Sequence, residues 1–339
     1  MPRAMTIHRF GLANLRSEQR DPEPLGEGLV RVGFKAVSLN HRDVLVMRGT
    51  YAPGLSLPLI PCSDGAGVVL GVGPGVLGVA PGDAVCSHMV PDWADGRLEP
   101  RMRLTTLGGP AQGVLCEERV LPAAAVVPMA KTLSFEQAAC LPVAGLAAWC
   151  ALTVEASVGP GHRVLLLGTG GVSTLGLQIA KTLGAQVAVV SSSDEKLSRM
   201  RALGADLTVN HRRGGWGDAV RRWSDGGVDV VLEIGGNGTL GQSVAATRDG
   251  GTIALLGVLG HGHSSHQTLL ADVLMRRIRV QGVFVGSRAD LERYLRFVET
   301  HAMEPVIDRV FEGITAARQA FAYLLSGRHV GKVVVRISP

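Results

Sequence analysis

Short apolar runs alternate with amphipathic segments through the middle of the chain. Each run is only a few residues long and apolar throughout, which is typical of parallel strands that are covered on both faces. The predicted strands are Val164–Leu167, Gln186–Val190, Leu207–Val209, Val228–Glu233 and Thr252–Leu256, with Arg279–Val285 as a last strand at the edge. The segments between them have helical spacing, as in Leu175–Leu183, Glu195–Leu203, Trp216–Trp223 and Leu240–Thr247. This alternation predicts an α/β domain with a doubly wound parallel sheet.

The flanking parts of the chain have a different pattern. Up to about Pro128, short β-like runs such as LVRVGFKAVSLN and GAGVVLGVG are broken by glycine and proline, and they predict a small β-barrel-like domain. The segment from Ser134 to Leu152 is rich in Ala and Leu at helical spacing, with Ser134 as its N-cap. The tail from Asp290 holds two helical segments and a strand at Gly331–Val335. Its pattern allows it either to extend the parallel sheet or to return to the first domain.

A glycine-rich turn follows the first predicted strand of the parallel sheet. Its glycines let the backbone turn tightly and bring bare N–H groups close to a pyrophosphate at the start of the next helix. Ser173 takes the third position of the G-x-G-x-x-G pattern, so the motif is incomplete. The strand–turn–helix–strand context is nevertheless that of a dinucleotide-binding unit. The expected contacts of the pyrophosphate are Gly168, Thr169, Gly170, Gly171 and Val172.

The end of the second predicted strand bears on which nicotinamide nucleotide binds. An acid about 20 residues past the motif would hold the ribose hydroxyls of NAD. Here Ser191, Ser192 and Ser193 stand at that place, with Lys196 one helical turn later. Hydroxyls and an ammonium group can bind a 2′-phosphate, whereas a carboxylate would repel it. We therefore expect NADP(H), with NAD(H) less favoured. Lys196 and the nearby Arg212 could equally be solvated surface charges. The candidate contacts beyond the glycine turn are Ser192, Ser193, Lys196, His211 and Gly257.

Composition narrows the class of protein. With 339 residues, 46% of them hydrophobic and 19% charged, the chain is long enough for two cores. The net charge of +5 is modest and aromatic residues make up only 4%, so we do not expect nucleic-acid binding. We see no run of about 18 apolar residues and no apolar signal near the N-terminus, and therefore expect neither a membrane span nor export. Five scattered cysteines fit reduced thiols in the cytoplasm.

Nearly the whole chain resembles the medium-chain dehydrogenase/reductase superfamily, close to its quinone-oxidoreductase and zinc-type-alcohol-dehydrogenase-like branches. The stretches that carry the resemblance are SLNHRDVLVMRGTY, IPCSDGAGVV, GDAV, EQAACLPVAGLAAW, GTGGVSTLGLQIAKTLGA, GADLTVN and HVGKVVV. The resemblance implies a GroES-like substrate domain over 1–128 and 287–339, interrupted by a Rossmann domain over 129–286. It also implies an active site in the cleft between the two domains.

Zinc-dependent members of this superfamily place a Cys, a His and a Cys where this sequence has Asn40, Ser63 and Val143. An amide and a hydroxyl are poor zinc ligands, and valine cannot coordinate a metal. No two cysteines lie within four residues of each other, so the paired cysteines of a structural zinc lobe are also missing. A rearranged site that includes Cys62 and Asp64 is conceivable, but we interpret both as structural residues. We therefore expect no zinc.

Without a metal, hydride transfer to an activated acceptor is easier than oxidation of a plain alcohol, because nothing else stabilises a developing alkoxide. We expect a zinc-independent reductase of a quinone, an enone or a similar small molecule. The alternatives are an alcohol or aldehyde dehydrogenase activity without zinc, and a protein that binds NADPH without turnover. By the resemblance, Asn40 lies near the nicotinamide and donates to cofactor or substrate. Tyr51 is a candidate donor and His41 a candidate proton source, although either could be structural.

The predicted edge strand Arg279–Val285 is apolar, and a bare apolar edge invites association. Pairing with the same strand of a second copy would bury it symmetrically, so we expect a homodimer.

Overall fold

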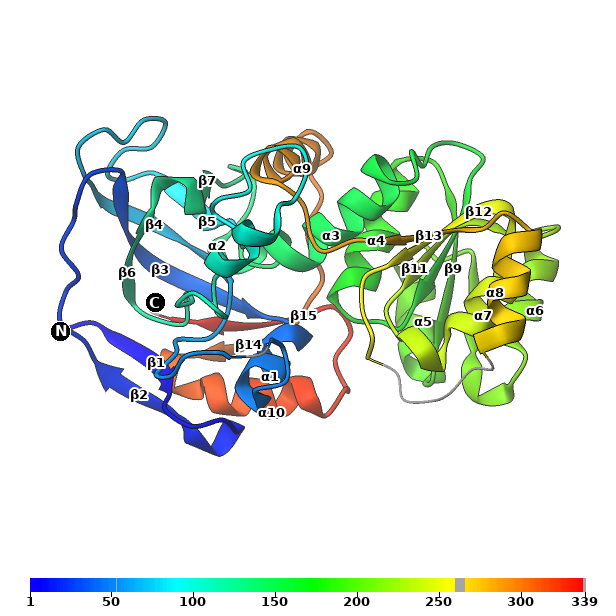
Figure 1. Ribbon diagram of the computed structural model, residues 1–339, viewed down its shortest axis with the longest axis horizontal. Helices are drawn as coiled ribbons and strands as arrows, with labels where there is room; N and C mark the ends of the chain where they lie inside the picture. The colour runs from blue at the N-terminus through cyan, green and yellow to red at the C-terminus, as the bar shows by residue number, and fades with distance from the viewer. Residues whose placement is uncertain (53, 260–265, 338–339) are drawn as a thin grey trace. The chain divides into compact units, whose positions relative to one another are not determined.

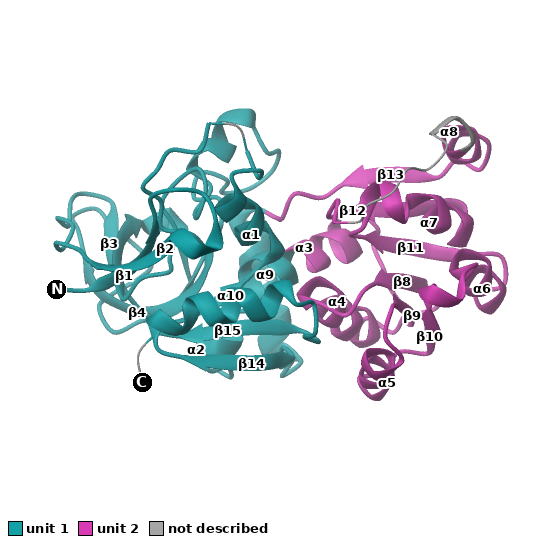
Figure 2. Cartoon of the chain, turned by 90° about the horizontal axis from the view of Figure 1, so that it is seen from below, with its two compact units in different colours: residues 1–146, 287–339 teal, residues 147–286 magenta. Residues whose placement is uncertain are grey.

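The computed structural model describes residues 1–52, 54–259 and 266–337, and the chain divides into two compact units (Figure 1, Figure 2). Unit 1 comprises residues 1–146 and 287–339, and unit 2 comprises residues 147–286. The first boundary therefore follows Leu146, later than the expected position after Pro128. Residues 129–146 go with unit 1 because helix α2 (Phe135–Ala138) packs against strands β3 (Leu29–Leu39) and β4 (Asp64–Val72).

The main sheet of unit 1 is mixed and mostly antiparallel. Its strands follow the order β14-β15-β3-β4-β5-β7, and β6 also pairs with β3. The further strands are β5 (Ala84–Ser87), β6 (Glu118–Pro122), β7 (Val126–Pro128), β14 (Ile307–Glu312) and β15 (Lys332–Arg336), while β1 (Arg3–Ile7) and β2 (Leu15–Gln19) form a separate pair. Helices α1 (His41–Arg48), α9 (Arg288–Thr300) and α10 (Ala317–Leu325) complete this unit. β15 runs antiparallel to β3, with Val334 opposite Ser38, so the tail returns to the first domain.

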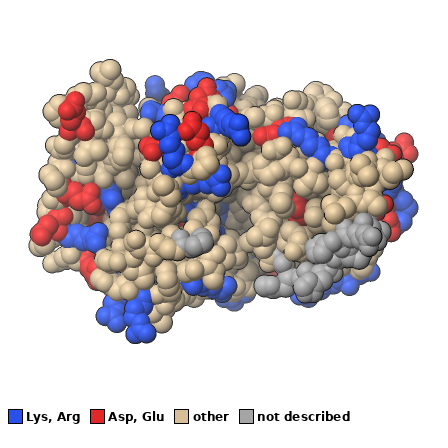
Figure 3. All heavy atoms as spheres, viewed as in Figure 1, with Lys and Arg blue, Asp and Glu red and all other residues tan. Residues whose placement is uncertain are grey.

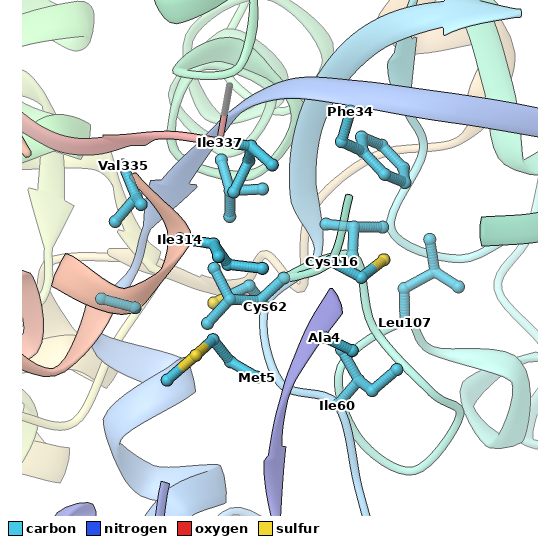
Figure 4. Close-up of a cluster of buried hydrophobic side chains, with 14 of the residues drawn as sticks. Ala4, Met5, Phe34, Ile60, Cys62, Leu107, Cys116, Ile314, Val335 and Ile337 are labelled. Atoms are coloured by element: carbon cyan, nitrogen blue, oxygen red, sulfur yellow. The ribbon is translucent and has the colours of Figure 1, made fainter. Parts of the chain in front are cut away.

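The core of unit 1 is built from both of its chain segments. In Figure 4, Met5 and Cys62 from the first segment lie around Ile314, and Val335 and Ile337 of the tail close the same cluster. All five of these side chains are at most 3% exposed. The tail therefore supplies part of the core of unit 1. The strand β15 is thereby held in register beside β3, where it carries a lysine into the interior.

Unit 2 is a parallel sheet covered by helices, as predicted. Its strand order is β10-β9-β8-β11-β12-β13, and every pairing within it is parallel. The strands are β8 (Arg163–Leu167), β9 (Gln186–Ser191), β10 (Leu207–Asn210), β11 (Val228–Glu233), β12 (Thr247–Leu255) and β13 (Arg279–Gly282), and the helices are α4 (Gly171–Thr182), α5 (Asp194–Ala202), α6 (Trp216–Trp223), α7 (Leu240–Ala246) and α8 (His266–Met275). The chain order reverses between β8 and β11, and ligands of such sheets bind beyond the carboxyl ends of the strands at this reversal.

The predicted helix over Ser134–Leu152 is not one regular α-helix. It consists of α2, a π-helical turn at Leu141–Gly145, α3 (Leu146–Trp149) and a second π-helical turn at Cys150–Val154. Pro142 lies in the first irregular turn, where its missing N–H cannot complete a regular helical bond. The last strand is also shorter than predicted, because β13 ends at Gly282 and Val285 lies beyond it.

One helical segment among the described residues, Phe135–Val154, is long and apolar enough to cross a membrane by length and composition alone. Its most apolar window is 72% buried inside the protein. Burial against other parts of the chain accounts for its apolar character. On the face drawn in Figure 3, basic and acidic groups lie side by side along the upper edge, so the net charge of +5 is not gathered into one patch there.

Candidate functional site

The glycine turn lies at the carboxyl end of β8 and leads into α4. Gly168 has a φ of 76°, which glycine adopts without strain, and Gly170 is the N-cap of α4. The first N–H groups of α4 and the bare backbone of the turn form a cradle that fits a pyrophosphate. Of the five predicted contacts, Thr169 is buried, whereas Gly168, Gly170, Gly171 and Val172 are partly exposed. Ser173 is buried and its Oγ donates to the carbonyl of Leu167 at 2.5 Å, so a serine here still ties the helix closely to the strand.

The serine run lies beside the glycine turn. The N–H of Gly168 donates to the carbonyl of Val190 at 2.7 Å, next to Ser191, the last residue of β9. Ser192 is partly exposed. Ser193 is the N-cap of α5, and its Oγ accepts from the backbone N–H of Lys196 at 3.4 Å. Ser193 therefore has a structural role as a helix cap. Ser192 has no part in this cap and is partly exposed, so it can contact a ligand.

Asp194 is an acidic residue close to the end of β9 that was not among the predicted site residues. It begins α5 directly after the serine run, and its carboxylate accepts from Nδ2 of Asn210 and from Nη2 of Arg213, both at 3.0 Å. The hydrogen bond from Asn210 and the charge of Arg213 lower the pKa of Asp194. His211 is exposed in the short 3₁₀ turn between these two partners. The sequence contained a signal for this residue, because Asp194 is the first acid after the strand Gln186–Ser191 and directly follows Ser193.

Glu233 is a fully buried acid at the carboxyl end of β11, and the sequence analysis gave it no role beyond the strand. One carboxylate oxygen accepts from the N–H groups of Gly235 and Gly236, at 2.6 and 3.0 Å, and from Oγ1 of Thr239 at 2.6 Å. The other accepts from Oγ of Ser243 at 2.5 Å. The signal that could have found it is an acid ending an apolar strand and followed by two glycines, as in VLEIGG.

Gly257, the last predicted cofactor contact, follows β12 and is bonded to the backbone of Glu233. Its N–H donates to the backbone carbonyl of Glu233 at 3.3 Å. A Cβ added at Gly257 would lie 2.8 Å from the carbonyl oxygen of Ile234, so only glycine fits there. The carboxylate of Glu233 therefore organises the loop after β11, and its backbone carbonyl contacts the loop after β12.

Asn40 lies in unit 1, between a buried acid and a buried base. Its Nδ2 donates to Oδ2 of Asp64 at 2.7 Å, and its Oδ1 accepts from Nζ of Lys332 at 2.6 Å. Nζ of Lys332 also donates to the carbonyl of Leu39 at 3.0 Å and lies 3.6 Å from Oδ2 of Asp64. Burial raises the pKa of Asp64, and the charge of Lys332 together with the hydrogen bond from Asn40 acts against this rise. Sequence reasoning missed Lys332, although the GKVVV motif contains it.

A second buried ion pair lies next to Asn40. Nη1 of Arg42 donates to Oδ1 of Asp43 and to Oγ of Ser63, both at 3.2 Å, and its Cζ lies 4.6 Å from the centre of the Tyr51 ring. The carboxylate of Asp43 also accepts from the backbone N–H of Asn40 at 2.8 Å. Burial raises the pKa of Asp43 to about 6, with the charge of Arg42 opposing. Asn40, Asp43, Asp64 and both basic residues thus form one connected network, which we call the Asn40 network.

His41 takes no part in that network through any hydrogen bond seen among the described residues. It is the first residue of α1 and is exposed. Partial burial of its ring and the charge of Arg48 lower its pKa from 6.5, so the neutral imidazole dominates at neutral pH. Tyr51 is partly exposed and packs on the core of unit 1 as well as on Arg42. The structure therefore brings Asn40 and Tyr51 to one cluster and leaves His41 at its margin.

Comparison with known proteins assigns the chain to a family. Residues 26–131 match the alcohol dehydrogenase GroES-like domain, and residues 171–300 match the zinc-binding dehydrogenase domain. A zinc-type alcohol dehydrogenase-like protein of Schizosaccharomyces pombe is 39% identical over 96% of this chain and 96% of its own length. The chain belongs to the medium-chain dehydrogenase/reductase superfamily.

Solved structures agree with this assignment. A putative alcohol dehydrogenase of Sinorhizobium meliloti 1021 has a TM-score of 0.92 at 39% identity, covering 99% of this chain and 98% of its own. An NAD-dependent alcohol dehydrogenase has a TM-score of 0.89 at 37% identity, covering 99% and 100%. This medium-chain dehydrogenase/reductase is therefore an oxidoreductase with a GroES-like unit and a Rossmann-like unit. Its superfamily works with a nicotinamide cofactor, and the glycine turn and Gly257 fit such a nucleotide.

Zinc, which the matched family's description names, does not fit the residues of the Asn40 network. Among the described residues no three His, Cys, Asp or Glu side chains come together as a group that could hold a metal ion. In the Asn40 network, two carboxylates (Asp43 and Asp64) already face two cations (Arg42 and Lys332). A divalent ion would add two positive charges to a buried site whose charges balance without it. The oxygen of Asn40 is moreover engaged by Lys332.

Proposed function

We propose that this protein is a zinc-independent, NADPH-dependent reductase of a quinone, an enone or a similarly activated carbonyl acceptor. The observation that carries the proposal is the ammonium group of Lys332, which lies 2.6 Å from Oδ1 of Asn40 and 3.6 Å from Asp64. The charge of Lys332 thus neutralises Asp64, the buried carboxylate that would otherwise be available to a metal ion. Chemistry that depends on a Lewis acid is correspondingly disfavoured.

The class of hydride acceptor follows from the hydrogen-bond donors that the site offers in the absence of a metal ion. Bound NADPH supplies a hydride, and conjugation in the acceptor spreads the charge that the hydride brings. The protein then has to orient the acceptor and donate one or two hydrogen bonds to its oxygen. The amide of Asn40 and the hydroxyl of Tyr51 are the candidate donors. His41 is a weaker candidate, because its lowered pKa leaves little protonated imidazole at neutral pH.

The preference for NADPH rests on the residues around the serine run. Ser192 and Lys196 favour a 2′-phosphate, and Arg213 offers a further positive charge that is partly neutralised by Asp194. Asp194 is the feature that favours NADH instead, and a similar solved structure is described as an NAD-dependent alcohol dehydrogenase. We place the preference with NADPH because Arg213 pairs with the charge of Asp194 and so weakens its repulsion of a 2′-phosphate.

A panel assay tests the function. The untagged protein is analysed for metal and then supplied with NADPH or NADH and a series of quinones and enones, with alcohols and NADP⁺ in the reverse direction. NADPH oxidation with a conjugated acceptor by zinc-free protein supports the proposal. Turnover only with alcohols favours a dehydrogenase without zinc, and silence in both directions favours a nucleotide-binding protein. One tightly bound zinc per chain, needed for turnover, would overturn zinc independence.

We further propose a homodimer that works in the cytoplasm. Among the described residues β13 pairs with β12 alone; Val280 on this strand is 43% exposed, and Phe284, just beyond its end, is 40% exposed. Leu270 and Leu274, one helical turn apart on α8, are also exposed. A second copy paired along β13 would cover this edge. All five cysteines are buried and free, which suits a reducing compartment. The molar mass in solution tests the dimer, and a monomer at micromolar concentration would refute it.

A further inference from the structure

Lys332 is a charged side chain placed inside unit 1. Its side chain is 3% exposed, and all three partners of its ammonium group come from the segments around β3 and β4: the carbonyl of Leu39, Oδ1 of Asn40 and the carboxylate of Asp64. Burying a lysine is costly unless its charge is paired and its hydrogen atoms are bonded. Here the charge is paired with Asp64, and two of the three hydrogen atoms have acceptors within 3.0 Å. The backbone of β15 holds the residue in place through its N–H, which donates to the carbonyl of Val306 at 2.9 Å.

The partners of Asn40 fix which way its amide points. An ammonium group has hydrogen atoms to donate and no acceptor, so it can meet only the oxygen of the amide. An ionised carboxylate can only accept, so Asp64 can meet only the NH₂ group. The two contacts, 2.6 Å to Lys332 and 2.7 Å to Asp64, therefore select one orientation and exclude the flipped one.

This orientation leaves one N–H of Asn40 available. Nδ2 carries two hydrogen atoms, and Asp64 takes one of them. Among the residues that the structure describes, no second acceptor for Nδ2 is found. Asn40 is 8% exposed, so a small part of it reaches the surface of unit 1. A flipped amide would offer an oxygen there instead, and an oxygen repels the developing negative charge on an acceptor.

We propose that Lys332 is a positioning residue that holds the Asn40 amide so that it presents an N–H, and not its oxygen, to the oxygen of the acceptor. The inference rests on the proposed reductase function, and it adds the reason why this site carries a buried lysine. Asp64 holds the other end of the same amide. Hydride transfer then meets a hydrogen-bond donor whose direction is fixed before the acceptor binds.

A double-mutant cycle tests the inference with the full-length protein. Asn40→Ala removes the donor, and we expect kcat with a quinone or enone to fall about 100- to 1,000-fold, the range for loss of one such donor. Lys332→Met should lower kcat at least tenfold, with the dissociation constant of NADPH changed less than twofold. In the Asn40→Ala background, Lys332→Met should lower kcat no further, because Lys332 acts through Asn40. Multiplicative losses in the double variant would overturn the inference.

Two further variants separate positioning from folding. Lys332→Met leaves Asp64 buried without its cation, so Asp64→Asn/Lys332→Met removes both charges and should recover thermal stability. It should not recover kcat, because the amide has lost both of its orienting charges. Recovery of full activity in this variant would refute the positioning role. Lys181→Met is the matched control: this lysine pairs with Asp206 at 2.8 Å on the surface of unit 2 and should leave kcat unchanged.

A measurement without turnover keeps the inference independent of the proposed function. In protein labelled with ¹⁵N-asparagine, the side-chain NH₂ signal that Asn40→Asp removes belongs to Asn40. We expect its two hydrogen atoms to exchange with water at different rates, because Asp64 protects one of them, and expect this difference to vanish in the Asp64→Asn/Lys332→Met protein. Equal, fast exchange in the native protein would overturn the orientation itself. If the native difference is seen and no acceptor is reduced, the proposed function fails while the orientation stands.

Discussion

The guanidinium group of Arg42 lies against the ring of Tyr51, with Cζ 4.6 Å from the ring centre. Arg42 is itself fixed by Asp43, by Ser63 and by the carbonyls of Leu107 and Gly109. The position of the Tyr51 ring therefore depends on a buried network and not only on the loop that carries it. A cation over an aromatic face is worth about 0.5–2 kcal/mol, so the stack contributes to stability as well as to position.

This stack separates two roles of Tyr51. Tyr51→Phe keeps the ring and removes the hydroxyl, which also takes part in a hydrogen bond with Arg42, so we expect the free energy of unfolding to fall by about 0.5–1.5 kcal/mol. If the hydroxyl donates to the acceptor, kcat falls about 100- to 1,000-fold. Tyr51→Ala should in addition destabilise unit 1 by about 1–3 kcal/mol. Denaturant unfolding and steady-state kinetics check both; an unchanged kcat in Tyr51→Phe would remove the hydroxyl from the mechanism.

Asp194 predicts a change in cofactor preference. Asp194→Asn keeps a hydrogen-bonding side chain at the start of α5 and removes a negative charge beside the serine run. We expect NADPH to bind about three- to tenfold more tightly, with little change for NADH, because only NADPH carries the 2′-phosphate that this charge repels. Titration of nucleotide fluorescence measures both constants. Asp206→Asn, at the acid that pairs with Lys181, is the charge-matched control. Equal gains for both nucleotides would place the phosphate elsewhere.

We expect the affinity for NADPH to depend on the buried acid Glu233. Glu233→Leu would leave the N–H groups of Gly235 and Gly236 unpaired, at a cost of about 1–3 kcal/mol each. We expect a clear loss of stability together with weaker NADPH binding, because the loop after β11 loses the carboxylate that binds its N–H and hydroxyl groups. Glu233→Gln retains one oxygen for these donors and should recover most of the affinity. Normal NADPH binding by a folded Glu233→Leu protein would show that the loops hold their shape without it.

The periodicity of the sequence predicted much of the fold, and the reasons for its failures are local. The buried strands of unit 2 were found because parallel strands covered on both faces are apolar throughout. The helix after Ser134 was predicted as regular although Pro142 lies within it, since spacing alone does not show where a backbone bond is missing. The pattern of the tail left its direction open, because β15 pairs with β3 across almost 300 residues of chain, whereas the resemblance placed the tail in the first domain.

The sequence made some residues of the candidate site visible and hid those that act through tertiary contacts. Asn40, Tyr51 and the glycine turn lie in contiguous motifs that the resemblance makes visible. Lys332 and Asp64 act on Asn40 through tertiary contacts, and a lone lysine in GKVVV looks like an ordinary strand residue. Glu233 was counted as part of a strand, because its partners are backbone N–H groups whose direction is set only by the folded loop. Such contacts become visible when the strands are placed in register.

The buried acid Asp43 predicts how stability depends on pH. Burial raises its pKa from the ordinary 3.8 to about 6, although Arg42 opposes the shift. Between these values the folded chain keeps a proton that the unfolded chain has released, so raising the pH through this window costs stability. Asp43→Asn lacks this titration. We therefore expect the free energy of unfolding of the native protein, relative to Asp43→Asn, to fall by up to about 3 kcal/mol from pH 4 to pH 7. Urea unfolding of both proteins at each pH gives the difference directly, and Asp64 titrates in both. A difference that grows in favour of the native protein as the pH rises would mean that the ion pair with Arg42 outweighs burial and that Asp43 is ionised throughout.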